Sequence, residues 1–349
     1  MTGFGGSTLF ELIHDYLKIY LPKQYQVSPN TIRSYRESLE LLVDFVKERK
    51  YIQLQDVTFE MLSADIILSF LDYLEISRGC SVTTRNNRLA AIRAFFGYAA
   101  DRDVTTVANL NELKKVPVKK PNEVSVVEYM SMAAITAIVE QADINTYKGL
   151  RDRFFMVLMY DTGARIQEMV DIKLCDLQIS KISKITLHGK GNKTRVVPLM
   201  ERTTQYLQKY MAEFHKNTPL SSQTPLFYTV THGNLHPLTD RRIRYLLKEY
   251  GEKARKQCAE VPENVHPHLF RHSRAMHLYQ EGMDLTLVSQ WLGHAHLETT
   301  QVYAHADTEH KRKAIAAATP ANNPLHSKLN PTRFTVSDDE TLKRLSGLR

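Results

Sequence analysis

The second half of the chain carries six side chains whose chemistry suits the transfer of a phosphoryl group. They are two arginines, a lysine, two histidines and a tyrosine, each near the end of a predicted helix or strand: Arg165, Lys190, His268, Arg271, His294 and Tyr303. His268 and Arg271 are three residues apart, so they share one face of a helix. Because these side chains supply both positive charge and proton donors, the set can act without a metal ion.

Each residue type has a physical reason to be in such a set. Two guanidinium groups can each bind the charged oxygens of a phosphodiester with paired hydrogen bonds, and a histidine can add one more. Losing one such donor typically costs ~100–1000-fold in rate. A tyrosine hydroxyl is a feasible nucleophile, but its ordinary pKa of ~10 leaves only about 0.1% ionised at pH 7. Nearby positive charge and a histidine that takes the proton would therefore have to assist it.

The first part of the chain predicts a bundle of helices. Apolar residues recur at helical spacing over four stretches, 9–20, 32–46, 64–76 and 89–99. Pro22 is expected to end the first helix. Two prolines and four lysines within residues 114–125 indicate an extended, solvated linker. The predicted organisation is a helical domain at 1–113, the linker at 114–125, a second domain at 126–320 and a tail at 321–349.

The second domain is predicted to be helical with one small sheet. Helical spacing indicates helices at about 131–143, 149–161, 201–215, 239–257, 269–280, 284–293, 298–304 and 308–318, with a short one at 338–346. Alternating residues at 182–187 and 194–197 flank a glycine-containing loop and predict an antiparallel hairpin. The expected fold class is therefore mainly α with a small antiparallel β-sheet.

Charge is unevenly distributed along the 349 residues. The formal net charge is +8, and residues 1–115 are neutral overall, so the remainder carries all of it. A basic balance favours a polyanionic partner. Between Glu75 and Asp101 there are four arginines and no acid. This favours contact with DNA by Arg78, Arg85, Arg88 and Arg93. The alternative is a plain solvated helix face.

Other features narrow the class of protein. No stretch approaches 18 apolar residues, and the first residues lack the pattern of a secretory signal. The three cysteines are isolated, which argues against a disulfide framework and against a CxxC zinc site. We expect a cytoplasmic protein that has no membrane partner and needs no cofactor.

Four segments, in this order, closely resemble motifs of the tyrosine recombinases, a family that includes phage and transposon integrases and Xer-type recombinases. The segments are Thr162-Gly-Ala-Arg-Ile-Gln-Glu168, Gly189-Lys-Gly-Asn-Lys-Thr-Arg-Val-Val-Pro198, His268-Leu-Phe-Arg-His-Ser-Arg-Ala275 and Leu292-Gly-His-Ala-His-Leu-Glu-Thr-Thr-Gln-Val-Tyr303. The resemblance covers nearly the whole chain. It implies a SAM-like, core-binding domain at 1–113 and a catalytic domain at 126–320.

The resemblance implies a role for each matching residue. Tyr303 would attack the scissile phosphate to form a 3′-phosphotyrosine, which Arg165 and Arg271 would hold. Lys190 would protonate the 5′ oxygen, while His268 would act as a base or proton shuttle. His294 would donate a hydrogen bond to the phosphate. Glu168 would support the site without touching the phosphate. Phe270 and Arg274 depart from the family pattern, which has leucine and an apolar or aromatic residue there, but neither change removes a catalytic group.

The resemblance further implies double-stranded DNA as the partner, a homo-tetramer on that DNA, and chemistry that needs neither metal nor ATP. Integration or excision of a mobile element is the expected role, with accessory recombinases or directionality factors as further partners. The tail at 321–349 would pack on a neighbouring protomer.

Several alternatives accompany these predictions. His268 and His272 have the i, i+4 spacing of zinc ligands, but the glutamate of an HExxH motif is missing. His272 is therefore interpreted as structural, and Lys193 competes with Lys190 for the lysine role. A type IB topoisomerase-like enzyme would nick and reseal without exchanging strands. A catalytically silent DNA-binding regulator would have the same fold and bind DNA without cutting it.

Overall fold

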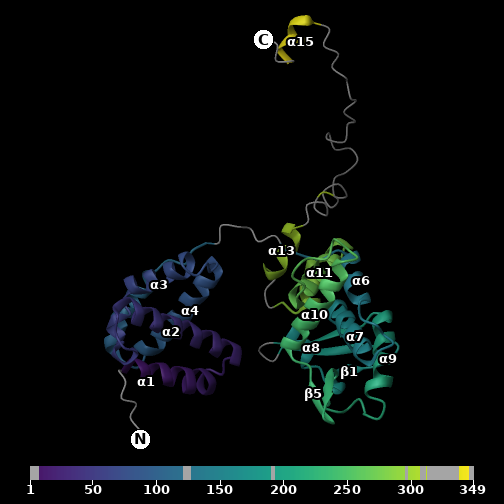
Figure 1. The fold of residues 1–349 in the computed structure, drawn as a ribbon, viewed down its shortest axis with the longest axis horizontal. Helices are drawn as coiled ribbons and strands as arrows, with labels where there is room; N and C mark the ends of the chain where they lie inside the picture. Colours follow the sequence, from purple (N-terminus) through teal and green to yellow (C-terminus); the bar gives the residue numbers. More distant parts are fainter. Residues whose placement is uncertain are drawn as a thin grey trace. The chain divides into compact units, whose positions relative to one another are not determined.

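A computed structural model describes residues 8–120, 127–189, 193–294, 298–306, 312 and 338–345. The chain divides into two compact units, which we term the N-terminal unit (Met1–Ser125) and the C-terminal unit (Val126–Arg349). Both are drawn in Figure 1. None of the described helices combines the length and apolarity that a bilayer-spanning segment requires.

Helices build the N-terminal unit. In chain order they are α1 (Thr8–Asp15), the π-helix η1 (Tyr16–Gln24), α2 (Pro29–Lys50), the 3-10 turns η2 (Leu54–Asp56) and η3 (Phe59–Met61), α3 (Ala64–Ile76), α4 (Val82–Ala100), the 3-10 turn η4 (Val104–Thr106) and α5 (Val107–Lys115). The hydroxyls of Ser28, Ser63 and Ser81 cap α2, α3 and α4 by accepting a backbone N–H of the first turn. All four helical stretches that the spacing predicted are therefore helical.

The first helical stretch continues past the proline that was expected to end it. Pro22 lies inside η1, where the wider π-type turn bonds each N–H to the carbonyl five residues back. The Tyr25 N–H accordingly donates to the Tyr20 carbonyl at 2.8 Å. Pro22 has no N–H to contribute, and this change of hydrogen-bond pattern carries the helix beyond it.

The described part of the predicted linker is exposed except at Val116, but its backbone is held against α4. Lys114 and Lys115 complete α5. The Arg93 guanidinium donates to the carbonyls of Leu113 and Lys114, each at 3.2 Å, and to that of Val116. Side chains of α4 thus supply donors to a proline-containing segment that cannot form a continuing helix. Residues 121–125 of the prediction lie outside the described residues.

Three of the four arginines assigned to DNA are occupied within the N-terminal unit. Arg85 is 1% exposed and donates to the Pro117 carbonyl at 2.7 Å, so its assignment as a DNA contact is wrong. Arg88 donates to the Ser34 carbonyl and the Ser38 hydroxyl, and Arg93 holds the segment after α5. Two of them also lie near carboxylates, Arg85 at 3.8 Å from Glu75 and Arg88 at 3.5 Å from Glu37. Arg78 is exposed at the end of α3.

The C-terminal unit is mostly helical with two small antiparallel sheets (Figure 1). Its elements are α6 (Met132–Glu140), α7 (Tyr147–Thr162), α8 (Ile166–Val170), the 3-10 turn η5 (Leu174–Asp176), β1 (Leu177–Gln178), β2 (Lys184–His188), β3 (Thr194–Pro198), α9 (Glu201–Phe214), β4 (Tyr228–Thr231), β5 (Asn234–Pro237), α10 (Asp240–Arg255), α11 (Pro267–Gln280), α12 (Leu285–Leu292), α13 (Glu298–Ala306) and α15 (Asp339–Leu345). The predicted fold class, mainly α with a small antiparallel sheet, is confirmed. The predicted helix at 308–318 falls almost entirely on residues that are not described.

The predicted hairpin is formed by β2 and β3, with His188 opposite Thr194 and Lys184 opposite Pro198. β1 adds a third strand on the far side of β2, and a second hairpin, β4–β5, was not predicted. Apolar side chains of α7, among them Phe154, Phe155 and Leu158, lie fully buried at the centre of the core. The described parts of the motifs contribute residues to this core, among them Ile166, Val197 and Phe270.

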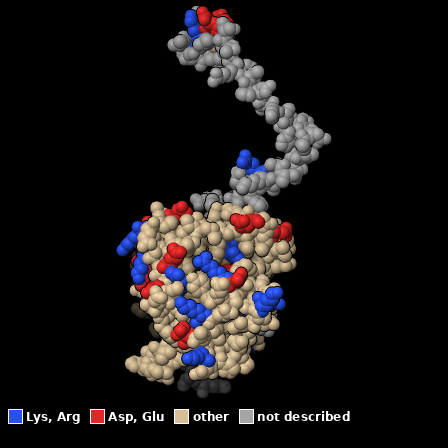
Figure 2. Space-filling model, turned by 90° about the vertical axis from the view of Figure 1, so that its right-hand side faces the viewer, with Lys and Arg blue, Asp and Glu red and all other residues tan. Residues whose placement is uncertain are grey.

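Figure 2 views the C-terminal unit from one side, and Lys and Arg side chains are interspersed with Asp and Glu on that face. Charges of both signs keep a surface soluble without forming a field of one sign. Among the described residues, this face therefore does not separate the two signs of charge.

Candidate active site

The first motif forms a tight turn between α7 and α8 that presents Arg165. α7 ends at Gly163, whose φ of 59° lies in the left-handed region that favours glycine. Arg165 then caps α8, and the buried Glu168 carboxylate accepts both its backbone N–H, at 2.8 Å, and its Nη1, at 3.0 Å. Glu168 thereby fixes the backbone and the side chain of Arg165 together.

A second arginine, Arg195 of β3, shares that carboxylate. Its Nη1 and Nη2 donate to the two oxygens of Glu168 at 3.0 and 2.8 Å, and its Nε donates to the Trp291 carbonyl at 3.0 Å. Burial alone would raise the pKa of Glu168, but the hydrogen bonds and charges of Arg195 and Arg165 outweigh it and hold the pKa below its ordinary value. The carboxylate is thus ionised and joins α8, β3 and the end of α12.

Arg271 lies beneath this pair, on α11. It is 4% exposed, and its Nη1 and Nη2 donate to the carbonyls of Gly163, at 2.6 Å, and Leu292, at 2.8 Å. Burial, followed by the positive charges of Arg165 and Arg195, lowers the pKa of the guanidinium to about 9. An anion bound here would relieve the repulsion among these groups.

Both predicted histidines stand at the same site and are neutral at pH 7. Burial, then the charge of Arg271, lowers the pKa of His268 below its ordinary value. The same two causes, followed by Arg165, lower the pKa of His294 to about 4, and its Nδ1 lies 2.7 Å from the Thr300 hydroxyl. A neutral imidazole has one N–H to donate and one nitrogen to accept a proton, so each can serve as a donor or as a base.

Tyr303 lies on α13 with its side chain buried, at 1% exposure. Its hydroxyl is 2.8 Å from Nδ1 of His272, on α11. Burial raises the pKa of the phenol, while the charge of Arg271 acts in the opposite direction. His272 follows Arg271 directly on α11, so its contact with Tyr303 brings the phenol to the helix that carries the second arginine.

The structure brings together most of the predicted site residues. Arg165, Glu168, His268, Arg271, His294 and Tyr303 affect one another electrostatically or share hydrogen-bond partners. Lys190 lies outside the described residues, and Lys193 is exposed at the start of β3. No group of three or more metal-ligating side chains converges anywhere in the described ranges.

Comparisons with known proteins match these features. Residues 128–310 match a family model described as the phage integrase family, and residues 13–103 match its N-terminal SAM-like domain. The chain belongs to the phage integrase family. It is a tyrosine recombinase, an enzyme of site-specific DNA recombination.

Relatives in this family cover the chain almost end to end. A putative integrase/recombinase, y4rC, of Sinorhizobium fredii is 30% identical over 98% of this chain and 99% of its own length. Tyrosine recombinase XerC of Staphylococcus haemolyticus is 33% identical over 84% of this chain and 92% of its own. Both are therefore similar to this chain in both of its units.

Solved structures show the same fold. The Tn1549 transposon integrase, in complex with transposon right end DNA, has a TM-score of 0.64 at 18% identity, covering 88% of this chain and 98% of that one. XerH recombinase bound to its difH substrate has a TM-score of 0.61 at 21% identity, covering 82% of this chain and 79% of that one. At such identities the likeness establishes the recombinase fold.

Sequence reasoning missed two residues of this recombinase site. Arg195 belongs to the Gly189–Pro198 motif, but a single arginine in a short strand resembles a surface residue. The sequence offered no signal for Arg195 beyond its place in that motif. His272 was interpreted as structural, and the sequence did not predict its contact with the Tyr303 hydroxyl.

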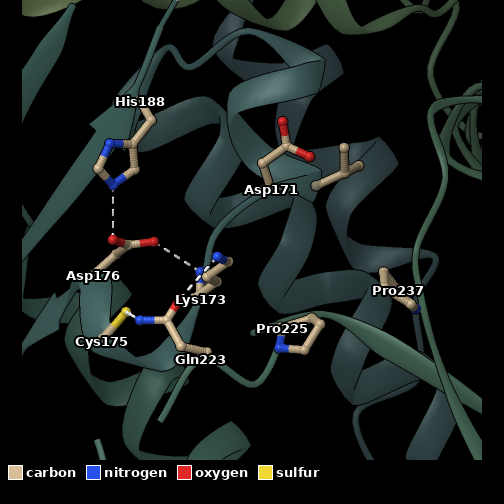
Figure 3. Close-up of a pocket in the computed structure, with 9 residues that line it drawn as sticks. Asp171, Lys173, Cys175, Asp176, His188, Gln223, Pro225 and Pro237 are labelled. Carbon is tan, nitrogen blue, oxygen red and sulfur yellow. Dashed lines mark hydrogen bonds and ion pairs between the residues drawn. The ribbon is translucent and has the colours of Figure 1, made fainter. Parts of the chain in front are cut away.

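A pocket elsewhere on the recombinase contains none of the predicted catalytic residues. It has a volume of about 720 Å³ and lies between η5, β2 and the segment before β4. Figure 3 shows His188 directed at Asp176, with 2.8 Å between Nε2 and Oδ1, and Lys173 bonded to Gln223. These polar groups hydrogen-bond to one another. The pocket is distinct from the arginine cluster because none of the residues that line it belongs to that cluster.

Gly163→Ala is expected to destabilise this recombinase by about 1–3 kcal/mol. A side chain with φ near 60° is strained, and the added Cβ would stand 2.7 Å from Cδ2 of Leu292. Urea unfolding measures the loss. Gly233→Ala is the matched control, since Gly233 also has positive φ but nothing within 4 Å. An equal loss in both variants would show that contact with Leu292 adds nothing.

Proposed function

We propose that this recombinase cuts and rejoins duplex DNA through a covalent 3′-phosphotyrosine intermediate on Tyr303. The observation that carries the proposal is geometric: Arg271 donates to the carbonyl of Gly163, two residues before Arg165, and the next residue of α11, His272, contacts the Tyr303 hydroxyl. A phosphodiester bound between the two arginines would therefore lie close to the helix that carries Tyr303. The positive surroundings would also favour the phenolate as it forms.

The cleavage step balances without any further reactant. The Tyr303 oxygen attacks the phosphorus, and the bond from phosphorus to the 5′ oxygen breaks. The phenolic proton passes to a histidine, for which we propose His268, and Lys190 gives a proton to the departing 5′ oxygen. Attack by a 5′ hydroxyl of a second duplex on the phosphotyrosine then reverses the step and joins the new strand, so ATP is not consumed.

The remaining residues stabilise charge in that step. Arg165 and Arg271 would bind the non-bridging oxygens, and His294 would donate a further hydrogen bond. Glu168 would keep Arg165 in place through the two hydrogen bonds that it accepts from that residue. These groups are positioned by buried partners, which is what catalysis by prearranged charge requires.

We propose duplex DNA as the partner, bound by both units, and a homo-tetramer as the assembly on it. The XerH and Tn1549 integrase structures are complexes with their DNA, which supports this choice. Arg78 is the exposed arginine of the original four and would contact the backbone of the DNA. Mobile-element integration or excision is the proposed role, with accessory recombinases as further partners, and the tail at 321–349 would pack on a neighbouring protomer.

A nicked suicide duplex tests the proposed chemistry. DNA flanking the gene is annealed so that cleavage releases a short fragment and traps the covalent product, and the reaction contains EDTA. We expect an SDS-resistant adduct whose nucleotide-bearing peptide includes Tyr303 when analysed by mass spectrometry. A nucleotide on any other peptide would overturn the assignment of Tyr303. Tight, salt-sensitive binding of a duplex that yields recombinant product without any adduct would overturn the covalent intermediate.

A further inference from the structure

The nucleophile of the proposed function is inaccessible where it lies. Tyr303 is 1% exposed, and a DNA phosphate cannot reach a hydroxyl that solvent itself does not reach. Its ring packs in a small cluster that is separate from the main core and joins α11, α12 and α13: Ala275, Met276, Val288, Leu292 and Tyr303. The structure therefore has Tyr303 in a resting position, which it must leave before attack.

A single polar contact accompanies that burial. Nδ1 of His272 lies 2.8 Å from the Tyr303 hydroxyl and is the one hydrogen-bond partner that the described residues offer to it. With both groups neutral, the phenol O–H donates and Nδ1 accepts, which leaves the imidazole proton on Nε2. Burial, then the charges of His268 and Arg271, lowers the pKa of His272 to about 4, which keeps the imidazole an acceptor at neutral pH.

We propose that His272 is a positioning residue for the nucleophile, whose hydrogen bond holds the Tyr303 hydroxyl in its buried resting position until the protein binds DNA. The inference rests on the proposed role of Tyr303. The docking of α13 also uses the apolar cluster and the contact between His294 and Thr300, but the bond from His272 is the one that acts on the Tyr303 hydroxyl itself. Leaving the position costs both the burial of the ring and an unpaired Nδ1.

The same helix offers a matched control pair. His277, five residues beyond His272 on α11, also has its Nδ1 2.8 Å from a tyrosine hydroxyl, that of Tyr160. Tyr160 is on α7 and takes no part in the proposed cleavage step. The Tyr160 hydroxyl also lies 3.1 Å from Sδ of Met132. A change at His277 therefore tests whether the effect of a lost histidine stays with the tyrosine that it contacts.

The test is nitration of the DNA-free, full-length protein by tetranitromethane, followed for each tyrosine by mass spectrometry. Cleavage after Glu298 and Glu309 isolates Tyr303 from the other tyrosines. His272→Leu fills the space without an acceptor, and we expect it to raise the nitration rate of Tyr303 roughly three- to tenfold, the scale of one lost hydrogen bond. His272→Asn supplies an amide oxygen near the former Nδ1 and should keep the rate within about twofold of the wild type.

The controls make the outcome decisive. His277→Leu should raise nitration of Tyr160 and leave Tyr303 unchanged. Equal rates for wild type and His272→Leu would overturn the proposal, as would an equal increase in the Leu and Asn variants, which would point to packing alone. Should His272→Leu fail to fold by circular dichroism, the comparison of Asn with Ala carries the same test. Because the readout needs no DNA, it is independent of the adduct experiment, which alone decides whether Tyr303 is the nucleophile.

Discussion

Tyr303→Phe is expected to eliminate the covalent adduct on a suicide duplex while leaving the recombinase folded and able to bind that duplex. The phenylalanine ring fills the same buried place among α11, α12 and α13, but it has no oxygen to attack phosphorus. Loss of a nucleophile lowers the rate by at least about 10⁴-fold, which is below detection in this assay. The measurement is the fraction of labelled DNA that migrates with protein in SDS.

Tyr160→Phe is the control for that variant. Tyr160 is partly buried, and its hydroxyl, like that of Tyr303, is bonded to a histidine of α11, so the substitution also removes a bond between tyrosine and histidine. It should form the adduct at close to the wild-type rate. An adduct that persists in Tyr303→Phe would mean that another of the tyrosines attacks the DNA.

The sequence predicted most of the candidate site because its residues fall in contiguous motifs. Arg165 and Glu168 lie on one helical turn, and His268 and Arg271 on another, so local spacing already places each pair together. Arg195 escaped prediction because its importance arises from a contact across 27 residues with Glu168. His272 escaped because its partner, Tyr303, is 31 residues away and on another helix.

The fold shows the same division between local and distant interactions. Helix starts at Ser28, Ser63 and Ser81 follow from local capping, which a sequence displays directly. The segment after α5 was predicted to be a solvated linker, and its described residues after Val116 are exposed. The sequence did not predict that Arg85 and Arg93, from a helix at least 20 residues earlier, bind its backbone carbonyls. A cluster of arginines with no acid between them in sequence can therefore bind carbonyls and carboxylates that are distant in sequence.

Arg271→Lys is expected to slow adduct formation ~100–1000-fold at saturating DNA, the range for loss of one oxyanion donor. Lysine keeps a positive charge but has no planar fork, so it cannot hold the Gly163 and Leu292 carbonyls and a phosphate oxygen in the same arrangement. Single-turnover formation of the adduct measures the chemical step without product release. Urea unfolding of the same variant measures how much the two lost carbonyl contacts contribute to stability.

Arg274→Lys separates the two contributions of Arg271. Arg274 lies three residues further along α11, is partly buried, and donates to the backbone carbonyl and the carboxylate of Asp161, each at 3.1 Å. Its replacement should cost comparable stability, about 1–3 kcal/mol for a charged hydrogen-bonded group, yet change the adduct rate by no more than about threefold. If both variants slowed adduct formation equally, Arg271 would act by holding the fold. A large difference at similar stability instead means that its guanidinium acts on the phosphate, since the helix, the charge and the loss of planarity are the same in both variants.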